Sequence, residues 1–270
     1  MSKLLVNVDK RENIDEVLKL DIGGIILSYD DLAVASNFYV NMDDIKEIRK
    51  KTDKIIVVSL NKMMHNKDLA KLEEVLIELD RIKVDMVLFY DVAIIEIKKK
   101  LGLDIPLIIS QEHLNTSINS NEFYFNQGVE GSLISSDITK EELLEIRKKT
   151  DKIIMFTGYG YLPIFYSRRY LITNYFAYIK KEKQGDCYFI RNNDDFYPIT
   201  QDEYGTIIYT KEPVNLVNEL DDLDDIDYIV IDGFKASDLV DVIKNFIKKK
   251  KMNGLYQGFF HTKSIYKVKK

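Results

Sequence analysis

Glu47-Ile-Arg-Lys-Lys-Thr-Asp-Lys-Ile-Ile56 recurs without change at positions 145–154, 98 residues further along the chain. Ten identical residues at a fixed distance indicate an internal structural repeat. The similarity extends upstream, where Gly24-Ile-Ile-Leu-Ser aligns with Gly131-Ser-Leu-Ile-Ser, and the first copy carries nine additional residues around 33–41. Each copy predicts a strand, a loop, an amphipathic helix and a second strand.

The helix of the second copy has recognisable ends. Thr139 precedes Glu141 and Glu142, which is typical of a helix N-cap followed by an acidic first turn. Arg147 and the two lysines after it place positive charge at the carbonyl end of the helix. The apolar run 152–157 that follows predicts a strand buried on both faces, as in a parallel sheet.

Eight strand-sized apolar segments alternate with helical segments along the chain. We predict strands at 4–8, 24–28, 55–60, 86–90, 106–110, 132–135, 153–157 and 228–232. Eight strand–helix units in 270 residues predict a (β/α)8, TIM-like barrel forming a single domain over residues 1–270. The repeat agrees, because its copies fall on units two to three and six to seven, half a barrel apart. A doubly wound open sheet is the alternative.

Composition narrows the class of protein. Hydrophobic residues make up 46% of the chain, enough for a large core, and no segment has the pattern of a membrane span or a signal peptide. The single cysteine, Cys187, excludes an internal disulfide framework and any zinc or iron–sulfur site built from several cysteines of this chain. We therefore expect a cytoplasmic protein without a membrane partner. With a net charge of −5, the chain lacks the overall basic character typical of nucleic-acid-binding proteins, but the sequence does not exclude a local basic patch.

Residues 158–212 interrupt the alternation and predict an insertion at the carboxyl-end rim of the barrel. The first half is dense in aromatic residues and contains Arg168 and Arg169, and we expect a helix there. The second half predicts a small β-meander with a turn at Glu203-Tyr-Gly205. A further helix is expected near 213–220. Insertions of this length are usually functional or carry their own structure.

Several segments resemble peptidase family U32, the collagenase-like proteases, in the shorter form common in low-GC bacteria. The resemblance spans nearly the whole chain and rests on these segments: Ser59-Leu-Asn-Lys62, Asn115-Thr-Ser-Ile-Asn, Leu133-Ile-Ser-Ser-Asp-Ile-Thr, Gly160-Tyr-Leu-Pro-Ile-Phe-Tyr-Ser-Arg-Arg-Tyr-Leu-Ile-Thr-Asn-Tyr, Tyr197-Pro-Ile and Glu203-Tyr-Gly-Thr206. It implies either peptide hydrolysis or participation in hydroxylation of tRNA or ribosomal RNA bases. Some members hold an iron–sulfur cluster with four cysteines, which this chain lacks, so we expect no cluster; any other cofactor stays open.

Polar residues at the predicted strand ends should converge on one rim of the barrel. We expect substrate-binding residues among Asn61, Lys62, Gln111, Tyr159, Ser167, Arg168 and Arg169, and candidate catalytic residues in His113 and Asp137. Asn7, Ser28 and Ser136 belong to the same predicted rim. Such a pocket suits an anionic or hydrogen-bonding ligand.

Each candidate also has a structural alternative. Asn61 and Lys62 would bind a carboxylate or phosphate, or else cap their strand. Arg168 and Arg169 would bind an anion by bidentate pairing, or else pair with acidic neighbours of the insertion. The aromatic residues of the insertion would stack on a base or a peptide ring, or else dock it onto the barrel.

Other residue types give weaker signals. Asp9, Asp91 and Asp232 would suit a divalent cation, but no His–Glu spacing supports a metal site, and we predict none. Cys187 lies on an apolar run without a histidine close in sequence, which is typical of a structural cysteine.

Three function classes follow: a peptidase, a participant in RNA base hydroxylation, and a non-catalytic ligand-binding barrel. No Gly-x-Ser-x-Gly or His-Glu-x-x-His motif supports hydrolysis. A peptide or an RNA is the expected substrate, and the oligomeric state stays open.

Overall fold

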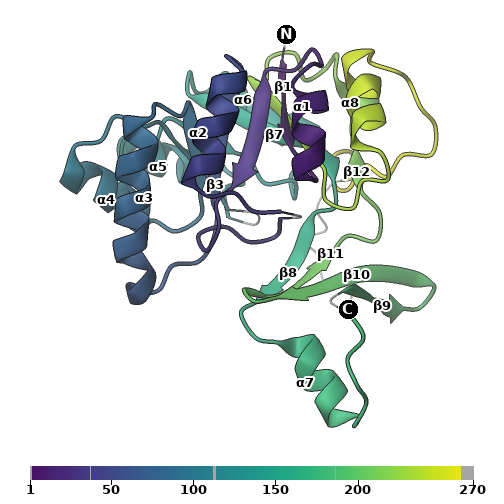
Figure 1. Ribbon diagram of the computed structural model, residues 1–270. Helices are drawn as coiled ribbons and strands as arrows, with labels where there is room; N and C mark the ends of the chain where they lie inside the picture. The colour runs from purple at the N-terminus through teal and green to yellow at the C-terminus, as the bar shows by residue number, and fades with distance from the viewer. Residues whose placement is uncertain (1, 37, 112–113, 186, 263–270) are drawn as a thin grey trace.

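The computed structural model describes residues 2–36, 38–111, 114–185 and 187–262. Eight parallel strands form a closed barrel in chain order, with β6 pairing with β7 to complete the ring and β1 pairing with the last strand, β13 (Figure 1). The strands are β1 (Lys3–Asn7), β2 (Gly24–Ser28), β3 (Ile55–Leu60), β4 (Met86–Phe89), β5 (Leu107–Ser110), β6 (Gly131–Leu133), β7 (Ile153–Gly160) and β13 (Tyr228–Asp232). The predicted (β/α)8 barrel is confirmed, and the open sheet is excluded by the β6–β7 pairing.

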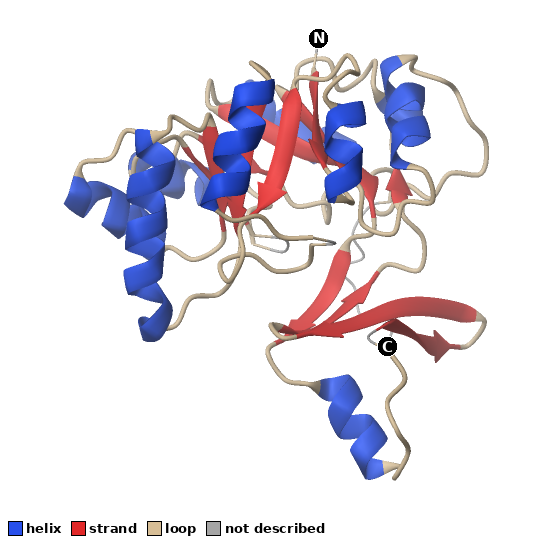
Figure 2. Cartoon of the chain, viewed as in Figure 1, coloured by secondary structure: helices blue, strands red, loops and turns tan. Residues whose placement is uncertain are grey.

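Helices cover the outside of this barrel (Figure 2). They are α1 (Ile14–Val17), α2 (Met42–Lys51), α3 (Leu69–Arg81), α4 (Ala93–Leu101), α5 (Ile118–Asn126), α6 (Lys140–Lys148) and α8 (Leu239–Ile247). Their apolar faces and the outward side chains of the strands form the larger core, while inward side chains fill the barrel itself.

The repeated sequence forms β2–α2–β3 and β6–α6–β7, as predicted. In each copy the same arginine ties the end of the helix to the next strand–helix unit. Arg49 Nη1 lies 2.8 Å from Asp85 Oδ2, which also accepts the Ile56 N–H at 2.8 Å. Arg147 Nη1 lies 3.3 Å from Asp227 Oδ2, and this oxygen accepts the Ile154 N–H at 2.8 Å. The identical sequences therefore form the same arginine–aspartate contact at two places half a barrel apart. We call each of these contacts, Arg49–Asp85 and Arg147–Asp227, a latch.

The insertion forms a second, antiparallel sheet in the order β8-β11-β10-β9. Its strands are β8 (Pro163–Ser167), β9 (Cys187–Asn192), β10 (Asp195–Asp202) and β11 (Gly205–Tyr209), with α7 (Leu171–Tyr178) between β8 and β9. The predicted helix and meander are present, with β8 as a fourth strand. β7 continues to Gly160, so the first residues of the predicted insertion belong to the barrel.

The predicted helix near 213–220 was wrong. This segment forms β12 (Val214–Asn215), which pairs antiparallel with β7, and a 3-10 turn at Val217–Glu219. Asn215 Oδ1 accepts the Val217 N–H at 3.1 Å, and Leu216 N–H donates to Gly158 O at 2.8 Å. Local side-chain capping and pairing with the barrel therefore replace the helical hydrogen bonds. None of the described helices is long and apolar enough to cross a membrane.

Candidate functional site

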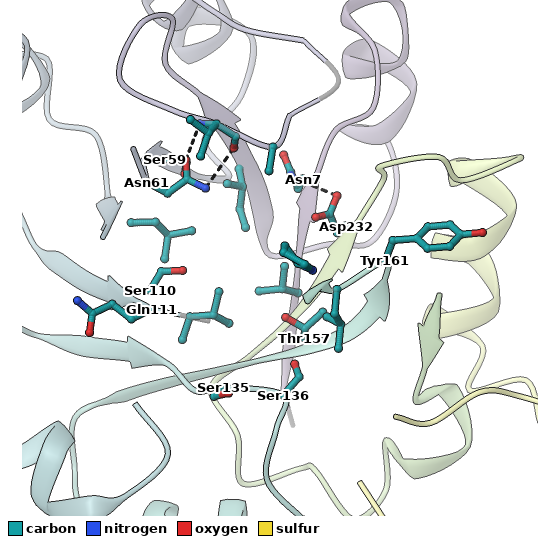
Figure 3. A pocket seen from close by; sticks show the side chains of 18 of the residues that line it. Asn7, Ser59, Asn61, Ser110, Gln111, Ser135, Ser136, Thr157, Tyr161 and Asp232 are labelled. Carbon is teal, nitrogen blue, oxygen red and sulfur yellow. Dashed lines mark hydrogen bonds between the residues drawn. The ribbon is translucent and has the colours of Figure 1, made fainter. Parts of the chain in front are cut away.

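A pocket of about 140 Å³ opens at the carboxyl ends of the barrel strands (Figure 3). This volume corresponds to roughly five water molecules, so it suits one small ring or side chain. Its polar lining consists of Asn7, Ser28, Ser59, Asn61, Ser110, Gln111, Ser135, Ser136, Asp137, Thr157, Tyr161 and Asp232. The carboxyl-end rim is where barrels of this kind carry their sites.

The pocket lies directly above an apolar layer inside the barrel. Side chains two residues apart on a strand point to the same face, and the inward apolar residues Leu5, Ile26, Val57, Ile108, Met155 and Val230 are each followed two positions later by a polar one. Those followers are Asn7, Ser28, Ser59, Ser110, Thr157 and Asp232, all of which line the pocket. The strand period therefore produces a ring of neutral donors and acceptors with one carboxyl group.

That carboxyl group is Asp232, the last residue of β13. Asn7 Nδ2 donates to Asp232 Oδ1 at 3.3 Å (Figure 3). The Phe234 N–H donates to the same oxygen at 2.8 Å. Burial raises the pKa of Asp232 to about 6, although both hydrogen bonds favour the ionised form and oppose this shift. Asp232 Oδ2 has no hydrogen-bond partner among the residues that the structure describes. Asp232 is therefore a candidate acid–base group for a pocket ligand.

One wall of the pocket is the loop after β2, which contributes Val34 and Ala35. Asn61 fixes this loop, because its Oδ1 accepts the Val34 N–H at 2.8 Å and its Nδ2 donates to Val34 O at 3.2 Å. Lys62 Nζ donates to Asp31 O at 2.7 Å and lies 3.4 Å from Asp68 Oδ1. Both side chains are thus engaged in holding the wall.

The insertion is attached to the same wall. Tyr204, in the turn between β10 and β11, donates to Asp30 Oδ1 at 3.2 Å, and its hydroxyl accepts the Asp31 N–H at 3.1 Å. Lys62 Nζ lies 5.4 Å from the centroid of the Tyr204 ring, within range of a cation–π contact. Arg168 Nη1 donates to Met63 O at 3.0 Å. We call this joint of Lys62, Arg168 and Tyr204 the insertion clamp.

Residues 31–250 match peptidase family U32. The chain belongs to this family. It is 28% identical over 214 residues to the tRNA hydroxylation protein P2 of Bacillus subtilis (strain 168), covering 76% of this chain and 68% of P2. It is 24% identical over 151 residues to the tRNA hydroxylation protein P1 of the same organism, covering 56% of this chain and 36% of P1.

Among solved structures, the U32 peptidase Mk0906 is similar, with a TM-score of 0.56 and 12% identity, over 86% of this chain and 93% of that one. At this identity the likeness supports the fold alone.

The U32 segments quoted from the sequence meet in the structure. Ser59, Asn61 and the residues of 133–137 line the pocket, whereas Lys62, Arg168 and Tyr204 form the insertion clamp. The resemblance therefore lies partly in the pocket and partly in the joint that shapes it.

The predicted site residues fall into two groups in this U32 chain. Asn61, Gln111 and Asp137 line the pocket. Gln111 is held by Tyr90 O, to which its Nε2 donates at 3.0 Å, and by the Tyr124 hydroxyl at 3.2 Å. Asp137 is exposed at the mouth, and its N–H donates to Ser135 Oγ at 3.2 Å. His113 lies outside the described residues.

The other predicted binders lie elsewhere. Lys62 is buried in the insertion clamp. Ser167 ends β8, where its Oγ accepts the Arg169 N–H at 3.2 Å. Arg169 is exposed, and neither it nor Arg168 pairs with an acidic residue in the described part of the chain. The anticipated ion pairs with acidic neighbours of the insertion are therefore not formed there.

Tyr159 points away from the pocket because β7 carries an extra residue. Val230 pairs with Thr157, but Ile231 pairs with Tyr159, so Gly158 forms a β-bulge. The bulge reverses the alternation, and the Tyr159 ring packs outside the barrel, edge-on to Phe246 of α8 with centroids 6.5 Å apart.

The three aspartates considered for a cation are committed to separate contacts. Asp9 Oδ1 accepts from Asn13 Nδ2 at 2.7 Å, and Asp91 accepts backbone N–H groups of Met64 and Ala93. Within residues 2–36, 38–111, 114–185 and 187–262, no cluster of three or more His, Cys, Asp or Glu could hold a metal ion.

Sequence reasoning missed Ser59, Ser110, Ser135, Thr157 and Tyr161 as lining residues. The first four could have been predicted from the strand alternation, since each follows an inward apolar residue by two positions. Tyr161 could not, because it follows the bulge, where the period no longer holds.

Proposed function

We propose that this chain takes part in the hydroxylation of tRNA, and that the barrel pocket binds the nucleotide to be modified. The similarity to tRNA hydroxylation protein P2 over 76% of the chain carries this proposal. In this proposal the protein works in the cytoplasm, where tRNA is found.

The lining chemistry is compatible with a nucleobase. Bases present neutral donors and acceptors on their edges, and the ring of serine, threonine and amide side chains offers both kinds of group. Enzymes that act on a base receive it unstacked, in an enclosed pocket. The contribution of this chain is to bind and orient the base and to hold a proton at Asp232.

The residues present do not fit an iron–sulfur cluster held by this chain alone. Such a cluster is usually held by four cysteine thiolates, and by two cysteines and two histidines in Rieske centres, whereas Cys187 is the single cysteine. It is exposed on β9 of the insertion, beside Lys235 Nζ, and does not line the pocket. The proposal therefore uses no cluster.

Peptide hydrolysis and pure ligand binding are the alternatives. The described residues that line the pocket include no histidine, lysine or cysteine to activate a hydroxyl nucleophile. The family name alone therefore supports hydrolysis.

The deciding experiment is mass spectrometry of tRNA nucleosides from a deletion strain, its parent, and strains complemented with wild type or Thr157→Val. We expect one hydroxylated nucleoside to disappear in the deletion strain and to return with the wild-type gene. Thr157→Val keeps the side-chain shape but removes a pocket hydroxyl, so we expect it to restore the nucleoside only in part. An unchanged nucleoside profile in the deletion strain would reject the proposal, and gelatin cleavage by the purified protein would then favour hydrolysis.

A further inference from the structure

Helix α7 exposes two tyrosine rings, although the Tyr175 ring also lies edge-on to the neighbouring Phe176 ring, with centroids 5.6 Å apart. Tyr175 is 58% exposed and Tyr178 is 85% exposed. They are three residues apart, so they lie on the same face of the helix. Neither hydroxyl forms a hydrogen bond with another residue in the described part of the chain. Burial of a large aromatic ring is normally favourable, so this face is suited to a partner.

Helix α7 lies on the far side of the small sheet from the barrel (Figure 1). One face of the small sheet packs on the barrel, where Tyr209 stacks on Phe234 with centroids 4.5 Å apart. α7 covers the opposite face, since the Phe176 ring lies 5.0 Å from Tyr188 and the Thr173 N–H donates to Gln201 Oε1 at 3.1 Å. The exposed tyrosines therefore do not serve to dock the insertion onto the barrel.

Positive charge predominates in the segment that carries these rings, although Asp202 and Glu203 line a hollow beside Tyr170 and Thr173. Residues 168–191 contain six lysines and arginines and two acidic residues, a net charge of +4, whereas the whole chain carries −5. Arg169, Lys180 and Lys181 are exposed and form no ion pair with another described residue. Lysines at a helix end also favour the helix dipole, but that role needs neither the exposed arginine nor the exposed rings.

We propose that the α7 face, with Tyr175 and Tyr178 on the helix and the exposed Arg169, Lys180 and Lys181 at its two ends, binds single-stranded nucleotides of the tRNA. Aromatic rings interleaved with cations are the arrangement that proteins use for single strands, with bases stacked on the rings and phosphates on the cations. RNA loops supply such unstacked bases. A protein partner fits less well, because lysine is depleted at protein–protein interfaces.

This inference rests on the proposed function and adds a second contact to it. The pocket takes the base of one nucleotide, and the α7 face binds neighbouring unpaired nucleotides of the same RNA. The insertion clamp connects the two, because it fixes the sheet that carries α7 to the wall of the pocket.

The test is fluorescence anisotropy of the purified full chain with labelled total tRNA and with a labelled anticodon stem-loop. Tyr175→Ala combined with Tyr178→Ala should weaken binding by about tenfold for each stacked base that is lost. Lys180→Glu combined with Lys181→Glu should also reduce the dependence of affinity on salt between about 50 and about 200 mM. Phe123→Ala and Lys250→Glu remove an exposed ring and an exposed cation from the barrel side, and both should bind as wild type does.

Thermal unfolding should be the same for all variants, because the substituted side chains are exposed. The inference is overturned if the double tyrosine variant binds tRNA as tightly as wild type. It is also overturned if that variant changes only self-association or the capture of a protein. A deletion strain with unaltered tRNA nucleosides would reject the proposed function instead, and the anisotropy result would still decide whether this face binds RNA.

Discussion

Asn7 donates a hydrogen bond to Asp232 at the carboxyl end of the barrel, where β1 and β13 pair with these two residues in register. The carboxyl group faces the pocket, and burial raises its pKa to about 6, compared with about 3.9 in an unfolded chain. The folded protein therefore binds this proton more tightly than the unfolded chain does. Its ionisation lowers the free energy of unfolding as the pH rises from about 4 to about 6.

We predict that Asp232→Asn removes this dependence. The amide oxygen still accepts the hydrogen bonds of Asn7 and Phe234 but never ionises. The variant should match wild type near pH 4 and exceed its free energy of unfolding by about 2 kcal/mol at pH 7. Urea unfolding across this range measures the difference, with Asp151→Asn, which replaces an exposed carboxylate, as the control. A constant difference between pH 4 and pH 7 would show that the pKa of Asp232 is not raised.

The second prediction concerns the latch formed by the repeat. Arg49→Ala and Arg147→Ala each remove a partly exposed ion pair and at least one hydrogen bond to a backbone carbonyl. Because solvent screens these pairs, we expect each to lower the free energy of unfolding by about 1 kcal/mol. The two sites lie half a barrel apart, so the double variant should show the sum of the two losses. Lys50→Ala, at an exposed position in the same repeat, should change little, and a large departure from additivity would disprove two independent latches.

The third prediction separates neighbouring arginines. Arg168 donates to Met63 O in the insertion clamp, whereas Arg169 is exposed. Arg168→Ala should therefore lower the free energy of unfolding by about 1 kcal/mol, and Arg169→Ala by less than about 0.5 kcal/mol. Arg169→Ala should instead weaken tRNA binding. Equal melting temperatures for the two variants would contradict the clamp.

Lys62 belongs to the same clamp but is buried. Lys62→Met keeps the apolar stem and removes the charge, so Asp68 loses its cation and Asp31 O loses its donor. We expect a loss of about 2 kcal/mol and faster proteolysis in the loop after β2. Lys67→Met, at an exposed position of the next turn, is the matched control. Wild-type resistance to protease in Lys62→Met would mean that this lysine does not hold the pocket wall.

The sequence predicted the barrel well because the repeat and the alternation of apolar segments are local signals. It also predicted that polar residues such as Asn7 and Asn61 would meet at one rim. It did not predict which of these residues contact other parts of the protein instead of facing the pocket. Lys62 is buried by Tyr204, which lies 142 positions further along the chain, and no local pattern encodes that contact. The prediction of a helix near 213–220 was wrong for the same reason, since pairing with β7 decides the conformation of this segment.

Tyr159 shows how one extra residue redirects a side chain, and it provides the last prediction. The bulge at Gly158 turns its ring toward Phe246, and a Cβ at Gly158 would lie 2.4 Å from Ile229 Cγ2. Tyr159→Phe keeps the packing and should leave both stability and tRNA binding unchanged. Tyr159→Ala opens a cavity in the core and should lower the free energy of unfolding by about 3 kcal/mol, and Gly158→Ala should lower it by at least about 1 kcal/mol through overpacking. If Tyr159→Phe instead lost tRNA binding with its melting temperature intact, the hydroxyl would contact the substrate, and the bulge would have to rearrange when RNA binds.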